Sequence, residues 1–155
     1  MTRLMLIFAA LAVLALGTAN GQGNWFGLRS GYPLGVTLHY GMANAFSPGV
    51  DMRISANLRI RGGDVSFGVG VDALSVVMVE GPFEVYVGGG PSLDFGGRGA
   101  LFGVHGLAGG EFRFRDLNLE QLGIFIELAL GAAIGIGRPS IIPTFGGAVG
   151  FNWRF

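Results

Sequence analysis

Hydrophobic and polar residues alternate with a period of two along most of this chain. From 50 to 60, the even-numbered residues are all apolar, whereas the odd-numbered residues are Asp, Arg, Ser, Asn and Arg. From 124 to 136, every second residue is aliphatic, and the residues between them are mostly small, with Glu127 among them. Successive side chains of a β-strand point to opposite sides, so this alternation predicts strands with one apolar and one polar face.

Turn-like clusters of Gly, Pro, Asn and Ser divide residues 24–155 into eight such segments. The strands are predicted at about 24–31, 33–42, 49–60, 64–78, 82–95, 100–114, 122–136 and 141–155. Most exceed the length of about five or six residues that is typical of soluble sheets, and they suit tilted membrane strands of about ten. The first hairpin has two interpretations, because Gly31-Tyr32-Pro33 is either a tight turn or a kink. A kink would remove one strand, and closure would then need another strand or another chain.

The charged residues follow the same alternation. Of twenty charged residues, nineteen follow Arg3, and eleven of these fall within predicted strands, each on the less hydrophobic face. A soluble lipocalin-like barrel or sandwich also alternates, but it turns the apolar face inward. Here that face is rich in Phe, Ile, Leu and Val, and the other mixes charge with Gly, Ala and Ser, which suits a small barrel in lipid. We therefore predict an all-β chain that forms an eight-stranded antiparallel transmembrane up-and-down β-barrel.

The first residues are typical of a secretory signal peptide. Arg3 supplies a positive charge, residues 4–16 form an unbroken apolar stretch, and Gly17-Thr18-Ala19 offers small residues for cleavage. The apolar stretch of thirteen residues is shorter than the length of about 20 that a spanning helix needs. We expect residues 1–19 to be removed on export and residues 20–155 to form the barrel.

Composition removes several classes of function. The chain has no Cys, so neither a disulfide framework nor thiol chemistry is available. Ten basic residues balance ten acidic ones, so no net field attracts nucleic acid. Half of the residues are hydrophobic and the mean hydropathy is +0.56, yet no apolar run after Leu16 approaches the length of a spanning helix. Thirty Gly and thirteen Phe favour strands over helices.

An even number of strands places both termini on the same side of a membrane, the periplasmic side in outer-membrane barrels. Aromatic residues of the predicted lipid face gather at that end: Phe26, Tyr40, Phe83, Phe112, Phe114, Phe151, Trp153 and Phe155. A smaller group maps near the other end: Tyr32, Phe67, Phe95 and Phe102. Two aromatic girdles are typical of transmembrane barrels.

The last residues carry a resemblance to a known family. The pattern Ala148-x-Gly150-x-x-Trp153-x-Phe155 resembles the C-terminal assembly signal of outer-membrane barrels, in which a polar residue and Gly precede two aromatic residues. Ala148 stands where this signal usually has a polar residue. The predicted outer connectors are also shorter than the extracellular loops that are usual in small outer-membrane barrels. The chain resembles the small eight-stranded barrels of the OmpA/OmpX type. This resemblance implies location in a bacterial outer membrane, contact with its lipids and insertion by the barrel-assembly machinery. We also expect a monomer without a nucleic-acid partner.

Polar side chains predicted to face the lumen define the candidate site. They are Arg29, His39, Asp51, Arg53, Asp72, Glu84, Glu111, Arg113, Glu127 and Arg154 in the periplasmic half, with Arg59 and Asp94 nearer the outside. Because an eight-stranded barrel is just wide enough for side chains and an isolated buried charge is unfavourable, we expect these groups to pair into a plug. The alternative is a set of hydrated, loosely paired groups. Inward-facing glycines of the outer half, such as Gly70 and Gly103, are attributed to strand curvature and to the fit of large neighbours rather than to a narrow cavity open to the exterior.

Three classes of function remain open. We favour a structural, envelope-integrity role with a largely closed lumen; the alternatives are a narrow pore or small-ligand binder and an enzyme at the lipid boundary. His39 and His105 are the two histidines, and neither lies on a nucleophile signature, so we expect no catalytic residue. The spacing of His, Asp and Glu does not suit a metal, and Gly88-Gly89-Gly90-Pro91 is not followed by a helix that would make it a phosphate loop. No cofactor is expected.

Overall fold

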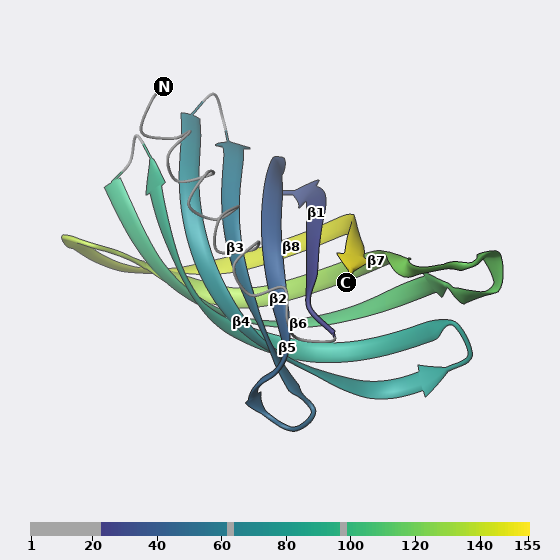
Figure 1. Cartoon of the computed structure of the whole chain (residues 1–155). Helices are drawn as coiled ribbons and strands as arrows, with labels where there is room; N and C mark the ends of the chain where they lie inside the picture. Colours follow the sequence, from purple (N-terminus) through teal and green to yellow (C-terminus); the bar gives the residue numbers. More distant parts are fainter. Residues whose placement is uncertain (1–22, 62–63, 97–98) are drawn as a thin grey trace.

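Eight strands and one short 3-10 helix form the described part of this chain (Figure 1). The computed structural model describes residues 23–61, 64–96 and 99–155, and the expected signal peptide, residues 1–19, lies outside them. The elements are β1 Trp25–Tyr32, β2 Gly35–Ser47, β3 Val50–Arg61, β4 Asp64–Glu80, β5 Phe83–Gly96, β6 Gly99–Phe114, η1 Arg115–Leu117, β7 Leu119–Gly135 and β8 Arg138–Arg154. No helix in these ranges is long and apolar enough to cross a membrane.

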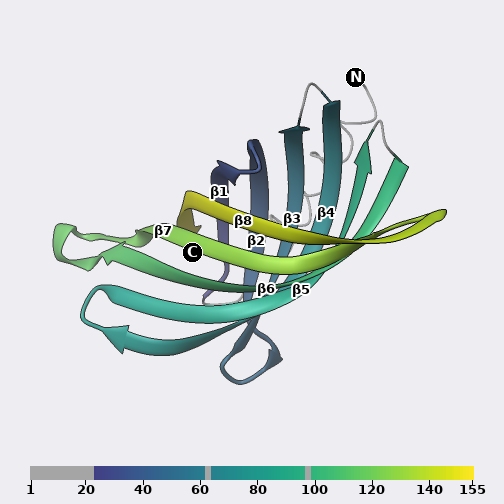
Figure 2. The same ribbon diagram turned by 180° about the vertical axis from the view of Figure 1, so that it is seen from behind.

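The sheet closes on itself (Figure 2). Each strand pairs antiparallel with its neighbours in sequence, and β1 also pairs with β8. Closure leaves no strand edge unpaired, as is needed where backbone groups meet hydrocarbon instead of water. The predicted eight-stranded, antiparallel, up-and-down barrel is confirmed.

The first hairpin consists of two strands and a turn. β1 ends at Tyr32, and β2 begins at Gly35 after Pro33 and Leu34. The Tyr32–Pro33 peptide bond is cis. The first of the two interpretations of Gly31-Tyr32-Pro33 is therefore correct, and the ring needs no strand from another chain.

The two ends of the barrel differ in that one of them, the C-terminal end, carries both ends of the barrel-forming chain. The C-terminal end carries the start of β1, the end of β8 and the connectors β2–β3, β4–β5 and β6–β7. In Figure 1 the β4–β5 and β6–β7 hairpins mark this end at the right. The far end carries the ends of β1, β3, β5 and β7 and the starts of β2, β4, β6 and β8.

Several strand boundaries were predicted wrongly. β2 runs to Ser47, although the turn-like residues Ala45 to Pro48 suggested a connector. The register with β3 shifts between Met42 and Ser47, and Asn44 has a φ of 55°. Such an irregularity lets a strand continue through residues that otherwise favour turns. β7 and β8 likewise begin earlier than predicted, at Leu119 and Arg138.

The two faces of the barrel wall differ in the way the alternation predicts. Ile126 is 59% exposed and Leu128 is 59% exposed, whereas Glu127 between them is 3% exposed. Among the described residues, exposed large hydrophobic side chains outnumber buried ones. Aliphatic side chains therefore cover the outside and ionic ones the inside, as in a barrel surrounded by lipid.

Aromatic rings gather on the outer surface at the C-terminal end. Phe155 lies beside Phe26 and Tyr40, with ring centroids 6.3 and 6.4 Å apart. Two residues of the expected assembly signal, Trp153 and Phe155, are exposed on the outside, while Gly150 faces inward. Tyr40 is 8% exposed beside these rings, and Phe83, Phe112 and Phe114 form a second group at the same end.

Inside the barrel, large side chains stand over glycines of the neighbouring strand. Trp25 lies opposite Gly41, and Phe125 lies opposite Gly150. A Cβ on Gly41 would fall 1.9 Å from the Trp25 ring, and a Cβ on Gly150 would fall 2.6 Å from the Phe125 ring. The Trp25 ring belongs to a small apolar cluster inside the lumen with Leu74, Tyr86 and Leu107. These interior glycines make room for neighbouring bulk.

Candidate functional site

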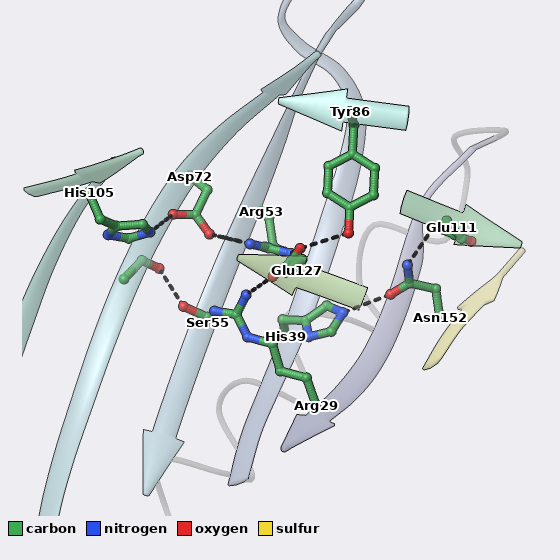
Figure 3. Close-up of polar contacts among 11 residues, drawn as sticks. Arg29, His39, Arg53, Ser55, Asp72, Tyr86, His105, Glu111, Glu127 and Asn152 are labelled. Atoms are coloured by element: carbon green, nitrogen blue, oxygen red, sulfur yellow. Dashed lines mark hydrogen bonds and ion pairs between the residues drawn. The ribbon is translucent and has the colours of Figure 1, made fainter. Parts of the chain in front are cut away.

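Charged side chains meet across the middle of the lumen (Figure 3). We define the central cluster as Arg29, Arg53, Asp72, Tyr86, His105 and Glu127. The Glu127 carboxylate accepts hydrogen bonds from the guanidinium groups of Arg29 and Arg53. It also accepts one from the Tyr86 hydroxyl at 2.8 Å. Arg53 donates from Nε and Nη2 to Asp72 Oδ2, at 3.0 and 2.9 Å. With His105 beside Asp72, the cluster links side chains of six strands into one network.

Strand register accounts for only part of this network. Arg53 and Asp72 lie directly opposite each other on β3 and β4. Glu127 lies on β7, which pairs with β6 and β8. Its contacts with Arg53 and Arg29 therefore cross the lumen and connect strands that are not neighbours. Arg53, Asp72 and Glu127 are 2%, 1% and 3% exposed, and charges buried to this degree need partners.

The charges of the central cluster balance one another. Two arginines face two carboxylates, and His105 Nε2 lies 2.9 Å from Asp72 Oδ1. Each carboxylate already accepts from an arginine, so this arrangement suits cross-linking of the walls better than general-base chemistry. Among the residues that the structure describes, no group of three or more His, Cys, Asp or Glu side chains could hold a metal ion.

A second set of ion pairs lies nearer the C-terminal end. Glu84 accepts from Arg113 at 2.6 Å and from Arg115 at 3.0 Å. Glu111 accepts from both terminal nitrogens of Arg154, one of them at 2.9 Å. The Glu84 pairs join β5 to β6 and η1. The Glu111 pair joins β6 to β8, two strands that do not pair directly.

His39 belongs to the polar network between these two sets. Its Nε2 lies 2.8 Å from Asn152 Oδ1, and Asn152 donates to Glu111 at 2.8 Å. The rings of His39 and Phe125 pack edge to face, with centroids 5.7 Å apart. Packing and hydrogen bonding hold this imidazole in place between β1, β7 and β8.

Three predicted interior residues lie apart from these networks. Asp51 accepts a hydrogen bond from the backbone N–H of Asn44 at 2.8 Å and so stabilises the β2–β3 turn. Arg59 and Asp94 pair with each other at 3.1 Å, toward the far end. The remaining predicted residues, Arg29, His39, Arg53, Asp72, Glu84, Glu111, Arg113, Glu127 and Arg154, are brought together as described above.

Several residues of the networks were missed in the sequence. Tyr86 and Asn152 share the inward faces of Glu84 and Arg154, so the period of two was a usable signal for both. Trp25, whose ring lies 5.7 Å from the Arg154 guanidinium carbon, precedes an outward Phe and could have been found in the same way. Arg115 belongs to η1, outside any strand, and no periodic signal marks it.

The central cluster separates two cavities in the lumen. The larger has a volume of about 560 Å³ and extends from Arg29 and Glu127 to the far-end connectors, where Pro33 and Ser140 line it. The smaller has a volume of about 190 Å³ and lies at the C-terminal end beside Trp25. The lumen is thus open from both ends and filled in the middle.

The larger cavity corrects the expectation about inward glycines. Gly70 lines this cavity, and a Cβ there would come 3.0 Å from the Ser55 hydroxyl. A Cβ on Gly90, in contrast, would lie 1.8 Å from the carbonyl oxygen of Val71. Glycine therefore permits close approach of backbones at some positions, and at others, including Gly103, it leaves room for a serine hydroxyl of the cavity wall.

Comparison with known proteins identifies the fold. The sequence matches no protein-family model and no curated protein sequence. The structure is similar to the N-terminal β-barrel domain of Pseudomonas aeruginosa OprF, with a TM-score of 0.57 and 14% identity over 88% of this chain and 100% of that one. It is similar to the Neisserial surface protein A, NspA, with a TM-score of 0.56 and 11% identity over 86% of this chain and 94% of that one. A weaker likeness, with a TM-score of 0.49 and 8% identity over 86% and 99% of the two chains, links it to the outer membrane enzyme PagL. This chain has the fold of the small eight-stranded outer-membrane β-barrels.

Proposed function

We propose that this protein is an integral barrel of a bacterial outer membrane, closed to solutes by the central cluster, with a structural role in the envelope. The observation that carries this proposal is the set of cross-lumen contacts that Glu127 of β7 makes with Arg53 of β3 and Arg29 of β1. They lie between the two cavities and replace a continuous passage with paired charges. Opening such a passage would require separating ions that are almost fully buried, which is strongly unfavourable.

The outer surface supports residence in a membrane and suggests an orientation. The wall displays aliphatic side chains, and aromatic rings surround its C-terminal end, where side chains of this kind prefer the interface between lipid and water. We place both chain termini on the periplasmic side. The far-end connectors then face the exterior, and the larger cavity opens there.

The closed sheet also bears on partners. A ring without a free strand edge offers no template for pairing with another chain, so the barrel is proposed to act as a monomer. Lipids of the outer membrane would be its main partners. The exposed Trp153 and Phe155 are proposed as contacts for the barrel-assembly machinery during insertion, together with Gly150.

Planar-bilayer recording tests the closed lumen. Purified wild-type protein is expected to give no steady conductance. The double variant Arg53→Ser with Glu127→Ser removes the cross-lumen pair and is expected to conduct small ions. The double variant Arg59→Ser with Asp94→Ser removes a pair outside the central cluster and serves as the matched control, which should stay closed. Steady conductance from the wild-type protein would refute the proposal.

No catalytic activity is part of the proposal. The two carboxylates of the central cluster are engaged by arginines, and His39 is held between Asn152 and Phe125. Mass spectrometry of outer-membrane lipids, with and without the protein, is expected to show the same acyl-chain composition. A lipid species that appears only with the wild-type protein would establish an enzyme instead.

A further inference from the structure

We propose that the larger cavity binds a small uncharged amphiphile, with hydroxyl groups on one side and an aliphatic part on the other, as in a short alkyl glycoside. The cavity has a volume of about 560 Å³, and ligand sites in proteins commonly measure about 300–1,000 Å³. It ends blindly at Arg29 and Glu127, so a ligand would be held in it and would not pass through. This inference goes beyond the structural role and does not depend on it.

One wall of the cavity is polar and contains an unsatisfied acceptor. It is formed by side chains of β2 to β5, namely Thr37, Ser55, Asn57, Ser66 and Ser92. Asn57 is 4% exposed, and its Oδ1 has no hydrogen-bond partner among the described residues. A buried acceptor without a partner is unfavourable, and rotation of the Asn57 amide toward the cavity would let a ligand hydroxyl donate to it. This wall therefore favours a ligand that carries hydroxyl groups.

The facing wall has an aliphatic part, beside the hydroxyl groups of Ser140 and Thr144. β6, β7 and β8 contribute Leu101, Leu107, Ala133 and Ile142 to the lining. Ala133 and Ile142 lie directly opposite each other on neighbouring strands, so they present one continuous apolar surface. A sugar without an apolar part would lose hydration against this surface, and a plain alkane would leave the polar wall unsatisfied. The two walls together favour an amphiphile.

The charges around the cavity are already paired. Arg59 donates to Asp94 at 3.1 Å, and Arg29 donates to Glu127. His105 lies 2.9 Å from an aspartate of the central cluster. An ionic ligand would find no unpaired counterion among the described residues of the lining and would lose its hydration without replacement. The ligand is therefore uncharged.

NMR titration with hexyl β-D-glucoside tests the proposal. The protein is refolded in phosphocholine micelles, and the glucoside is added below its own micelle-forming concentration. The side-chain amide resonance of Asn57 is expected to shift saturably, which separates binding in the cavity from partition into the micelle. Glucose and sodium hexanoate are expected to bind at least about tenfold more weakly, because each lacks one half of the required chemistry. No saturable shift with the glucoside, or equal binding of hexanoate, would overturn the proposal.

Two adjacent alanines provide matched variants. Ala133 faces the cavity, whereas Ala132 is exposed on the outer wall. Ala133→Trp is expected to weaken binding at least about tenfold, and Ala132→Trp is expected to leave it within about twofold. If Ala133→Trp does not fold, Asn57→Leu is used with the backbone amide of Gly70 as reporter, and a loss of about tenfold is expected. Unchanged binding in the folded variant would overturn the site.

The same chemistry could reach the cavity from the medium or from a lipid headgroup. The titration is therefore repeated in nanodiscs with and without monoglucosyl diacylglycerol. A shift of Asn57 by the free glucoside alone indicates a soluble ligand, and a shift by the glycolipid indicates a headgroup. Absence of a shift in both arms would refute the proposal.

Discussion

Removal of the Glu127 charge is the sharpest perturbation of the interior. Glu127 is 3% exposed and accepts from Arg29, Arg53 and Tyr86. Breaking a buried ion pair by removal of one partner costs about 3–5 kcal/mol. Arg53 keeps its bonds to Asp72, and the side chain of Arg29 is already 15% exposed, so part of the loss is offset. We expect Glu127→Gln to lower the free energy of unfolding by about 3 kcal/mol.

The assay is urea-induced unfolding from lipid vesicles, followed by tryptophan fluorescence and by heat-modifiable gel mobility. Glu120→Gln makes the same chemical change at an exposed position and should stay within about 0.5 kcal/mol of the wild type. Arg29→Met in both backgrounds completes a double-mutant cycle, with an expected coupling energy above about 1 kcal/mol. If Glu127→Gln unfolds within about 0.5 kcal/mol of the wild type, the central cluster does not hold the walls together.

Three further predictions address packing, the partly exposed ion pair between Arg59 and Asp94, and assembly. Gly41→Ala places a Cβ 1.9 Å from the Trp25 ring and should lower stability in the same unfolding assay by about 1–3 kcal/mol. Gly110→Ala, whose Cβ would meet nothing nearer than 4.0 Å, should have little effect, and equal losses would contradict the packing argument. Asp94→Asn breaks a pair whose arginine side chain is 35% exposed, so it should cost less than about 1 kcal/mol, and a loss as large as that of Glu127→Gln would be contrary evidence. Deletion of Phe155 should reduce the amount of folded barrel in outer-membrane fractions on heat-modifiability gels, and an unchanged amount would argue against its role in assembly.

The two faces of the barrel wall could be predicted from the sequence, because the odd or even position of a residue in its strand determines whether its side chain points outward or into the lumen. In β7 the aliphatic residues at every second position from Ile124 to Ile136 face outward, and Glu127 faces inward, as the alternation required. The end of β2 could not be predicted, since local preferences for a turn at Ala45 to Ser47 compete with pairing to β3, and the register shift resolves that competition.

The alternation shows which side chains face the lumen, but it does not show which of them touch one another. The pairing of Arg53 with Asp72 follows from a hairpin register, which a sequence suggests. The choice of Glu127 as the second partner of Arg53 depends on the curvature and stagger of strands that are not neighbours. The same holds for the link from Asn152 to Glu111, and for the balance between filled and empty volume that leaves the larger cavity.

Quenching of the two tryptophans by brominated lipid tests most directly which side of the wall faces the membrane. The chain has two Trp residues, of which Trp25 is 6% exposed inside the barrel and Trp153 is 39% exposed outside it. In vesicles with brominated acyl chains, Trp25→Phe leaves only Trp153, and its fluorescence should be strongly quenched. Trp153→Phe leaves only Trp25, and its fluorescence should be nearly unchanged. Strong quenching of Trp25 with little quenching of Trp153 would contradict the assignment of the apolar face to lipid and of the ionic face to an enclosed lumen.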